Sequence, residues 1–215
     1  MRLLLKFQKK EEVKFISHLD MQRLFQRALR RAKLPCAYSQ GFNPHLLISF
    51  ACALPVGVCS NAEYVEVQLE KFYHPSECIR RLNEVLPQGV KVINAVEPDE
   101  KYPNVGSVII ASEYTLIPEN VEDFSDKLKE LLSRETIEIE KKTKKGMTVV
   151  NVRPMIHRLS MVENVIKATL SSSNTENLRA DKLQEILENE GIKISSVCRD
   201  TLFILNGNKI EEPIN

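Results

Sequence analysis

Four arginines within one short stretch of the chain are the side chains best suited to binding an anion. They are Arg23, Arg27, Arg30 and Arg31, and lysines flank them on both sides. Each guanidinium can donate two parallel hydrogen bonds to the oxygens of a phosphate. The cluster therefore indicates a nucleic-acid backbone, RNA in particular, as the partner. The alternative is a solvated helix face, on which exposed ion pairs contribute about 0–1 kcal/mol each.

The loop that follows these arginines adds hydrogen-bonding and aromatic groups beside them. Gly41 can adopt a positive φ, which would let a ligand approach the backbone closely. Tyr38 and Phe42 could stack on unpaired bases if they are exposed. A plain connecting turn would use the same residue types. The candidate RNA-binding residues of this loop are Ser39, Gln40, Gly41, Phe42 and Asn43.

Two histidines bracket the basic segment and are the candidate catalytic residues. His18 stands at the expected start of a helix, and His45 ends the loop. Two converging imidazoles could cleave RNA without a metal, one taking the 2′-hydroxyl proton and the other protonating the leaving oxygen. The N-terminus of a helix would lower the pKa of His18 and favour its basic form. The alternative is that both histidines are hydrogen-bonded structural residues.

The other chemistry-bearing residues do not form a pattern typical of a metal or cofactor site. The five cysteines include no CxxC pair, so neither a zinc site nor a disulfide framework is expected. The sequence also lacks a Walker loop, GxGxxG, GxSxG and the three close cysteines of a cluster that cleaves S-adenosylmethionine. Glu63 and Glu66 lie on an alternating segment and are expected to face solvent. We therefore predict no cofactor and no metal, and we expect burial of Cys36, Cys52 and Cys59.

The composition is that of a globular protein with one basic region. The chain has 215 residues, 43% hydrophobic and 27% charged, which allows one large domain or two small ones whose core needs no metal or disulfide staples. Its net charge of +1 conceals +7 in residues 1–50, −9 in residues 51–140 and +3 in residues 141–215. No apolar run approaches the roughly 20 residues of a membrane helix, and the first ten residues do not resemble a signal peptide. The sequence therefore predicts a cytoplasmic protein with a local anionic partner and no membrane partner.

The hydrophobic pattern of the first half predicts the order strand, helix, strand, strand, helix, strand. Ser17 is expected to cap the first helix, with Asp20 in the position of a capping-box acid. Pro35 is expected to end that helix. The second helix is expected at 75–86, and the strands at 2–7, 46–53, 63–70 and 89–96.

A similar order recurs in the second half and predicts an α+β fold of two tandem ferredoxin-like (βαββαβ) units with antiparallel sheets. Val121 is expected on the buried face of the first helix of this half. Helices are expected at 120–132 and from 177 or 180 to 187, strands at 107–116, 136–140, 147–153, 165–170 and 192–205, and a basic turn at 141–146. The predicted units are 1–97 and 107–206, with a linker at 98–106 and a polar, frayed tail at 207–215.

The segment from Phe15 to Tyr64 resembles one family closely. The pieces that carry the resemblance are Ser17-His18-Leu19-Asp20, Arg27-Ala28-Leu29-Arg30-Arg31, Gly41-Phe42-Asn43-Pro44-His45, Leu54-Pro55-Val56-Gly57 and Ala62-Glu63-Tyr64. They are similar to the radical S-adenosylmethionine (radical SAM)-linked, or radical SAM-associated, family, a domain of unknown function. Cys59 departs from the pattern, which has a polar or acidic residue there. Two later pieces also look similar, so the resemblance extends over nearly the whole chain: Val152-Arg153-Pro154 and Asn177-Leu178-Arg179.

The resemblance implies an accessory module. Members stand alone, or are joined to or encoded beside a radical SAM protein, in neighbourhoods with an RNase and ribosomal proteins. A radical SAM protein is thus the implied protein partner, and tRNA or rRNA the implied RNA. Three hypotheses follow: an RNA-binding module, a metal-independent endoribonuclease that uses His18 and His45, and a protein–protein adaptor for a radical SAM enzyme. Alone, the chain is expected to bind rather than to catalyse.

Overall fold

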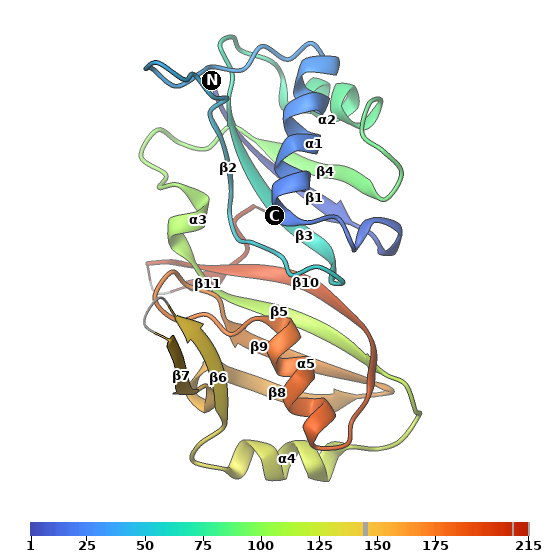
Figure 1. Cartoon of the computed structure of the whole chain (residues 1–215). Coiled ribbons are helices and arrows are strands. Elements are labelled where there is room, and N and C mark those ends of the chain that lie inside the picture. Colours follow the sequence, from blue (N-terminus) through green and yellow to red (C-terminus); the bar gives the residue numbers. More distant parts are fainter. Residues whose placement is uncertain (144–145, 208, 215) are drawn as a thin grey trace.

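The computed structural model describes residues 1–143, 146–207 and 209–214 and shows a large sheet with helices packed against it (Figure 1). The fold is α+β, as the sequence predicted. It has a nine-stranded, mostly antiparallel sheet and, within the described ranges, five α-helices. None of the described helices is both long and apolar enough to cross a lipid bilayer.

The first half of the chain follows the predicted order of strands and helices. Its elements are β1 (Arg2–Lys9), α1 (His18–Arg31), β2 (Ile48–Phe50), β3 (Cys59–Gln68), α2 (Pro75–Asn83) and β4 (Val90–Val96), with a short 3₁₀ turn at Glu11–Val13. The prediction of a strand over 46–53 was wrong in extent. β2 pairs with β3 over three residues only, because the chain then turns away toward Pro55, which has no N–H to donate to a ladder.

The second half holds two strands that the sequence did not reveal and a hairpin that stands apart from the main sheet. Its elements are α3 (Val105–Val108), β5 (Ile109–Pro118), α4 (Ser125–Ser133), β6 (Glu138–Thr143), β7 (Gly146–Asn151), a 3₁₀ turn (Arg153–Met155), β8 (Ile156–Val162), β9 (Val165–Ser171), α5 (Ala180–Asn189), β10 (Ile194–Asn206) and β11 (Lys209–Glu211). Among the described strands, β6 and β7 pair only with each other, and the prediction missed β8 and β11. The expected start of α4 was wrong, since Val121 precedes the helix and is 81% exposed. The predicted basic turn at 141–146 includes residues 144 and 145, which lie outside the described residues.

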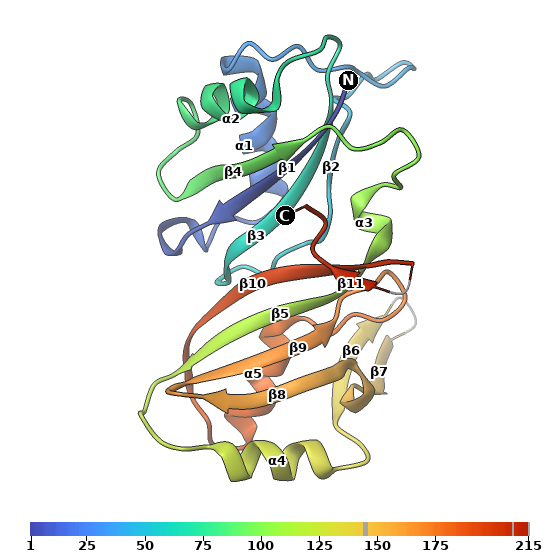
Figure 2. The same cartoon turned by 180° about the vertical axis from the view of Figure 1, so that it is seen from behind.

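The main sheet runs without interruption through both halves, in the order β4-β1-β3-β10-β5-β9-β8. All of its pairings are antiparallel except that of β3 with β10, which joins the halves through the pairs Cys198–Cys59 and Arg199–Ser60. α1 and α5 lie in front of this sheet in Figure 1 and behind it in Figure 2, and α2 packs in one core cluster with α1, so the three helices cover the same face. The two halves therefore share a sheet as well as a helical layer.

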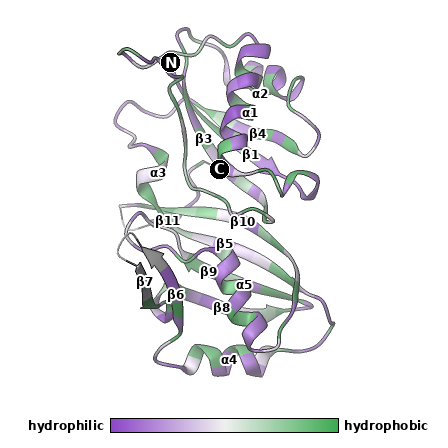
Figure 3. Cartoon of the chain, viewed as in Figure 1, coloured by the Kyte–Doolittle hydropathy of each residue, from purple (hydrophilic) through white to green (hydrophobic). Residues whose placement is uncertain are grey.

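The first helix is held by its cap and by its apolar face. The Ser17 hydroxyl accepts a hydrogen bond from the Asp20 backbone amide at 3.2 Å, as predicted. Phe25 is fully buried and packs at 4.6 Å, centroid to centroid, against Phe7 of β1. The outward face of α1 is mainly hydrophilic (Figure 3). Burial of one face thus fixes which side chains α1 presents to solvent.

The segment predicted as a linker and the C-terminal tail both pack against the face of the sheet opposite α1. α3 lies close to Ala51, the residue after β2, where a Cβ on Gly106 would come 2.9 Å from the Ala51 carbonyl oxygen. The prediction of a frayed tail was wrong for its described residues. β11 pairs with β10, and Ile214 is only 9% exposed, in a cluster with Tyr64 and Leu4.

Candidate functional site

Three of the four arginines form a stripe along α1. The spacing of four residues places Arg23, Arg27 and Arg31 on one face of the helix. They line a groove of about 740 Å³ between α1 and the segment that follows α2. The other lining residues are Phe15, Ile16, Asp20, Leu24, Ala28, Glu84, Val85, Leu86 and Pro87.

The charges in this groove are predominantly positive and only partly neutralised. Asp20 accepts hydrogen bonds from the Ser17 hydroxyl and from Arg23, which hold the pKa of its carboxyl below the usual range. Glu84, on the opposite wall, is paired with Arg80 of α2 at 2.5 Å. Within the described ranges, the guanidiniums of Arg27 and Arg31 form no hydrogen bond or ion pair, and both residues are exposed. These two cations are thus free to meet an external anion.

The fourth arginine lies on a different side of the helix. Arg30 lines a shallow hollow of about 400 Å³ together with Lys33, Tyr38, Glu70 and Tyr73. The four arginines predicted to form one binding surface are therefore divided between two. Tyr38, at 44% exposed, lies with Arg30 rather than with the groove.

Not all of the lysines flanking the arginines point outward. Lys9 is 3% exposed, and its ammonium donates to the carbonyl oxygens of Lys14 and Ile16, each at 2.9 Å. Burial lowers the pKa of Lys9. Lys10 donates to Asn61 at 3.1 Å, and Lys14 pairs with Glu11. These contacts remove Lys9 from any surface site.

The loop from 39 to 45 is closed by its two ends and presents its middle to solvent. The Ser39 hydroxyl accepts from the His45 backbone amide at 3.1 Å and lies 2.8 Å from Nδ1 of the His45 ring. Gly41 has a φ of +126°, as its predicted role requires, and Phe42 is fully exposed. Gln40 and Asn43 are exposed beside them. The loop is suited to contact a partner at its tip, while His45 serves to close it.

The two candidate catalytic histidines are not brought together. The His18 ring packs against Phe50 at 5.6 Å, and His45 precedes Phe50 by five residues along an extended segment, or roughly 16 Å at strand spacing. Figure 1 places the loop beyond the other end of α1 from His18. His18 lines a hollow of only about 20 Å³, too small for a nucleotide. The histidines therefore cannot share one scissile bond in this structure.

The environment of His18 is that of a partly buried neutral imidazole. Burial lowers the pKa of His18, Lys9 acts in the same direction, and Glu63 acts in the opposite one. The Gln22 side-chain amide donates to Nε2 of His18 at 3.0 Å. This contact requires Nε2 to carry a lone pair rather than a proton.

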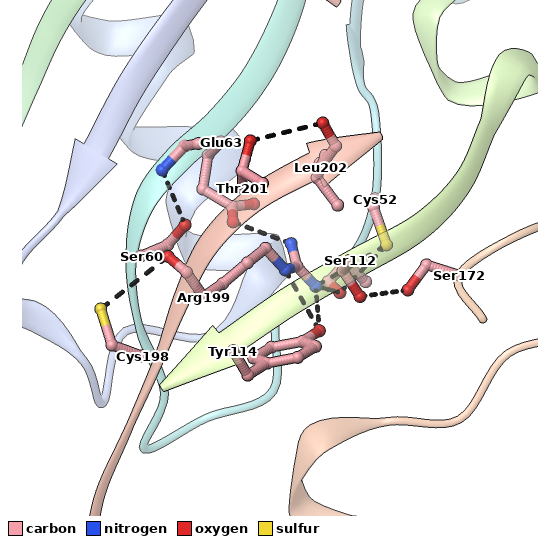
Figure 4. Close-up of polar contacts among 12 residues, drawn as sticks. Cys52, Ser60, Glu63, Ser112, Tyr114, Ser172, Cys198, Arg199, Thr201 and Leu202 are labelled. Atoms are coloured by element: carbon pink, nitrogen blue, oxygen red, sulfur yellow. Dashed lines mark hydrogen bonds and ion pairs between the residues drawn. The ribbon is translucent and has the colours of Figure 1, made fainter. Parts of the chain in front are cut away.

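A buried charged cluster that the sequence did not indicate lies where the two halves meet (Figure 4). Arg199 of β10 is 1% exposed and donates to the Glu63 carboxylate at 2.8 Å and to the Tyr114 hydroxyl at 3.1 and 3.2 Å. It also donates to the Ala53 carbonyl oxygen at 3.3 Å, and Cys52 lies beside it. Burial is the largest single influence and lowers the pKa of Arg199, but the charge of Glu63 together with Tyr114 and Cys52 outweighs it, and the net shift is upward.

This cluster corrects the solvent-facing prediction for the strand glutamates. Glu63 is 4% exposed, and Glu66 is partly buried and held in a double hydrogen bond by Arg2 at 2.7 and 2.9 Å. The alternation of polar and apolar residues in this strand could not indicate the partners, Arg199 and Arg2, because each lies far away in the sequence. A charged residue inside an otherwise apolar strand, such as Arg199, was the feature of the sequence that could have indicated a buried ion pair.

The cysteines form no metal site in the part of the chain that the structure describes. All five are free thiols, and no group of three or more potential ligands gathers among the described residues. Cys36 and Cys59 are buried, as predicted, whereas Cys52 is only partly buried. Burial raises the pKa of Cys36 to about 11 and also raises that of Cys52, so neither thiol is activated as a nucleophile.

Together, the fold and the groove define a small α+β protein with a cationic surface site on its first helix. The family model described as "Uncharacterized protein conserved in bacteria (DUF2344)" matches residues 2–180, and the chain belongs to that family. This description names no activity, ligand or partner. A search of the curated proteins finds no match to the chain.

Proposed function

We propose that the protein binds RNA through the groove of α1. The observation that carries this proposal is the stripe of Arg23, Arg27 and Arg31, of which the last two form no ion pair with any residue that the structure describes. Successive arginines of the stripe are about 6 Å apart along the helix axis, comparable with the separation of neighbouring phosphates on a nucleic-acid strand. Phe15, 72% exposed at the end of the groove, offers a ring for stacking.

The loop at 39–45 would make a second contact with the same RNA. Its tip offers Phe42 for stacking and the amides of Gln40 and Asn43 for hydrogen bonds to base edges. Arg30, in the last turn of α1, and Tyr38, just before the loop, line the same hollow. A strand long enough to reach both would bind more tightly than one confined to the groove.

We also propose that residues 1–97 and 107–206 are two ferredoxin-like units that share their sheet. The strand order β4-β1-β3-β2 in the first half and β10-β5-β9-β8 in the second supports this, since each places the unit's strands in the order last, first, third, second. In this proposal the hairpin β6–β7 is an insertion in the second unit. The groove then belongs to the helical layer of the first unit rather than to its sheet.

By resemblance, the proposal includes a radical SAM protein as the partner to which RNA is presented. A cytoplasmic location is part of the same proposal, and the five free thiols suit it. The nuclease alternative is not favoured, because His18 and His45 lie apart. In the adaptor alternative, Arg27 and Arg31 would bind acidic groups of a partner protein instead of RNA.

The test is fluorescence anisotropy with total tRNA and with an rRNA fragment, over a salt series and with EDTA. The variant Arg27→Gln/Arg31→Gln should weaken binding about tenfold and lower the salt slope by about 1.4, since each phosphate contact to a single strand contributes about 0.7. A control, Lys129→Gln/Arg134→Gln, removes the same charge from α4 and from the residue that follows it. Equal affinity and slope for the groove variant and the wild type, or no binding at low salt, would contradict the proposal.

The same samples distinguish the alternatives. RNA that stays intact on a gel is expected for a binding module. Cleavage in EDTA that disappears in His18→Ala would instead support the nuclease. Recovery of a radical SAM protein from an RNase-treated lysate, with no RNA binding, would support the adaptor.

A further inference from the structure

A second hollow in the other half of the molecule is lined by residues of the hairpin β6–β7 and of the start of α5. Figure 1 shows where these elements lie in the fold. Its volume is about 590 Å³, within the range of pockets that hold small molecules. Its floor is apolar and contains no aromatic ring, so it offers nothing for a nucleobase to stack on. The floor residues are Ile139, Met147, Val150, Val152, Met155 and Leu178.

Backbone hydrogen bonds, and hydrogen bonds from the guanidinium of Arg153, hold the segments that form the walls of this pocket. The Val152 amide donates to the Ile137 carbonyl at 2.7 Å, and the Leu178 amide to the Ser171 carbonyl at 3.0 Å. The Arg153 guanidinium donates to the carbonyl oxygens of Leu132 and Ile156, at 2.8 and 3.2 Å. Residues 152–154 and 177–179 are the two later segments that carry the family resemblance, and they thus meet at one pocket.

The rim of the pocket is cationic. Lys141, Arg179 and Lys182 line it, against one carboxylate, Glu140. Arg179 is paired with Asp181 and Lys182 with Glu185, but these pairs are at the surface and weak. Lys141 has no side-chain hydrogen bond or ion pair within the described ranges. The rim can therefore turn its cations toward a bound anion, and the exposed amide of Asn177 adds a donor.

We infer that this pocket binds a small anion with an apolar body, such as a medium-chain carboxylate. The apolar body would cover the valine and methionine floor, where flexible thioethers adapt to its shape. The carboxylate would lie at the rim, against Lys141 and Arg179. This site is separate in position and in chemistry from the groove of α1, and it does not depend on RNA binding.

Isothermal titration with decanoate, below its micelle concentration, tests this inference. Saturable binding of one decanoate per chain is expected, with acetate not binding and decyltrimethylammonium at least tenfold weaker. Lys141→Gln/Arg179→Gln should weaken decanoate binding at least tenfold, and Val150→Glu should abolish it by placing a carboxylate in the floor. The control Lys127→Gln/Lys129→Gln removes the same charge from α4 and should bind as the wild type does.

Three outcomes would overturn the inference: no saturable binding of decanoate, equal binding of the cationic surfactant, or full affinity in Lys141→Gln/Arg179→Gln. Both positions of that variant are exposed, so it tests the pocket without disturbing the core. Decanoate binding that survives Arg27→Gln/Arg31→Gln separates this pocket from the proposed RNA site.

Discussion

At the scale of single residues, the ion pair between Arg199 and Glu63 is the contact whose loss should matter most. Both side chains are buried, with 2% and 5% exposed. Arg199→Met leaves the Glu63 carboxylate without a partner, and we expect it to lower the free energy of unfolding by about 3–5 kcal/mol. Urea denaturation followed by circular dichroism measures this change.

The double variant Arg199→Met/Glu63→Leu separates the value of the pair from the penalty of an unpaired charge. Since apolar residues of similar size can replace a buried pair at little cost, the double variant should be more stable than Arg199→Met alone. If instead the two changes add, the charges do not interact in the way that the 2.8 Å contact implies.

His18 should make the stability of the protein dependent on pH. Its pKa is lowered in the folded state, so below the ordinary histidine pKa of about 6.5 the unfolded chain binds more protons than the folded one. The stabilisation that the protein gains from neutral His18 is therefore complete above pH 6.5, and it is lost as the pH falls through the pKa that His18 has in the folded state. Melting temperatures between pH 7.5 and 5.5 should fall more steeply for the wild type than for His18→Gln. Parallel curves would exclude this role of His18.

At the scale of single residues, the sequence could predict the properties that depend on the spacing of neighbouring residues. The arginines of α1 are exposed because the apolar residues at Met21, Phe25 and Ala28 set the buried face. The burial of Glu63 could not be predicted, because its partner lies 136 residues away. The separation of His18 from His45 was likewise hidden, since closeness in sequence does not show how far α1 carries the chain from His18 before the loop that ends at His45.

At the scale of elements, the C-terminal tail should contribute measurable stability. Ile214 is 9% exposed and packs with Tyr64 and Leu4, whereas Ile210 of β11 is 66% exposed. Ile214→Ala should lower the free energy of unfolding by about 1.5–3 kcal/mol, and Ile210→Ala by less than about 0.5 kcal/mol. Chemical denaturation compares the two matched variants. Equal and negligible effects would mean that the tail frays, as its polar sequence suggested.

The elements that sequence patterns revealed are those with a clear period and a recognisable end. α1 has a cap at Ser17 and a regular apolar stripe, and its start was predicted to within a residue. β8 was missed because it lies at the edge of the sheet, where exposed residues such as Arg158 interrupt the alternation. The tail was misjudged because β11 is stabilised by its pairing with β10 rather than by its own residues.

At the scale of the whole molecule, the junction between β3 and β10 determines how the two halves depend on each other. The pairing involves only two residue pairs, but the Arg199–Glu63 contact crosses it and Tyr114 of β5 closes it from the other side. Neither half buries this cluster alone. Separation of the halves would therefore expose the edges of both strands and leave charges unpaired.

The chain should accordingly unfold in a single cooperative transition rather than half by half. Calorimetry should give one peak, with equal calorimetric and van't Hoff enthalpies, and hydrogen exchange should protect β1 and β9 to the same global level. Glu63→Gln weakens the contact across the junction and should split the transition or lower the protection of one half first. Two separate peaks in the wild type would show that the shared sheet does not couple the halves, and that each core is stable without the buried charges between them.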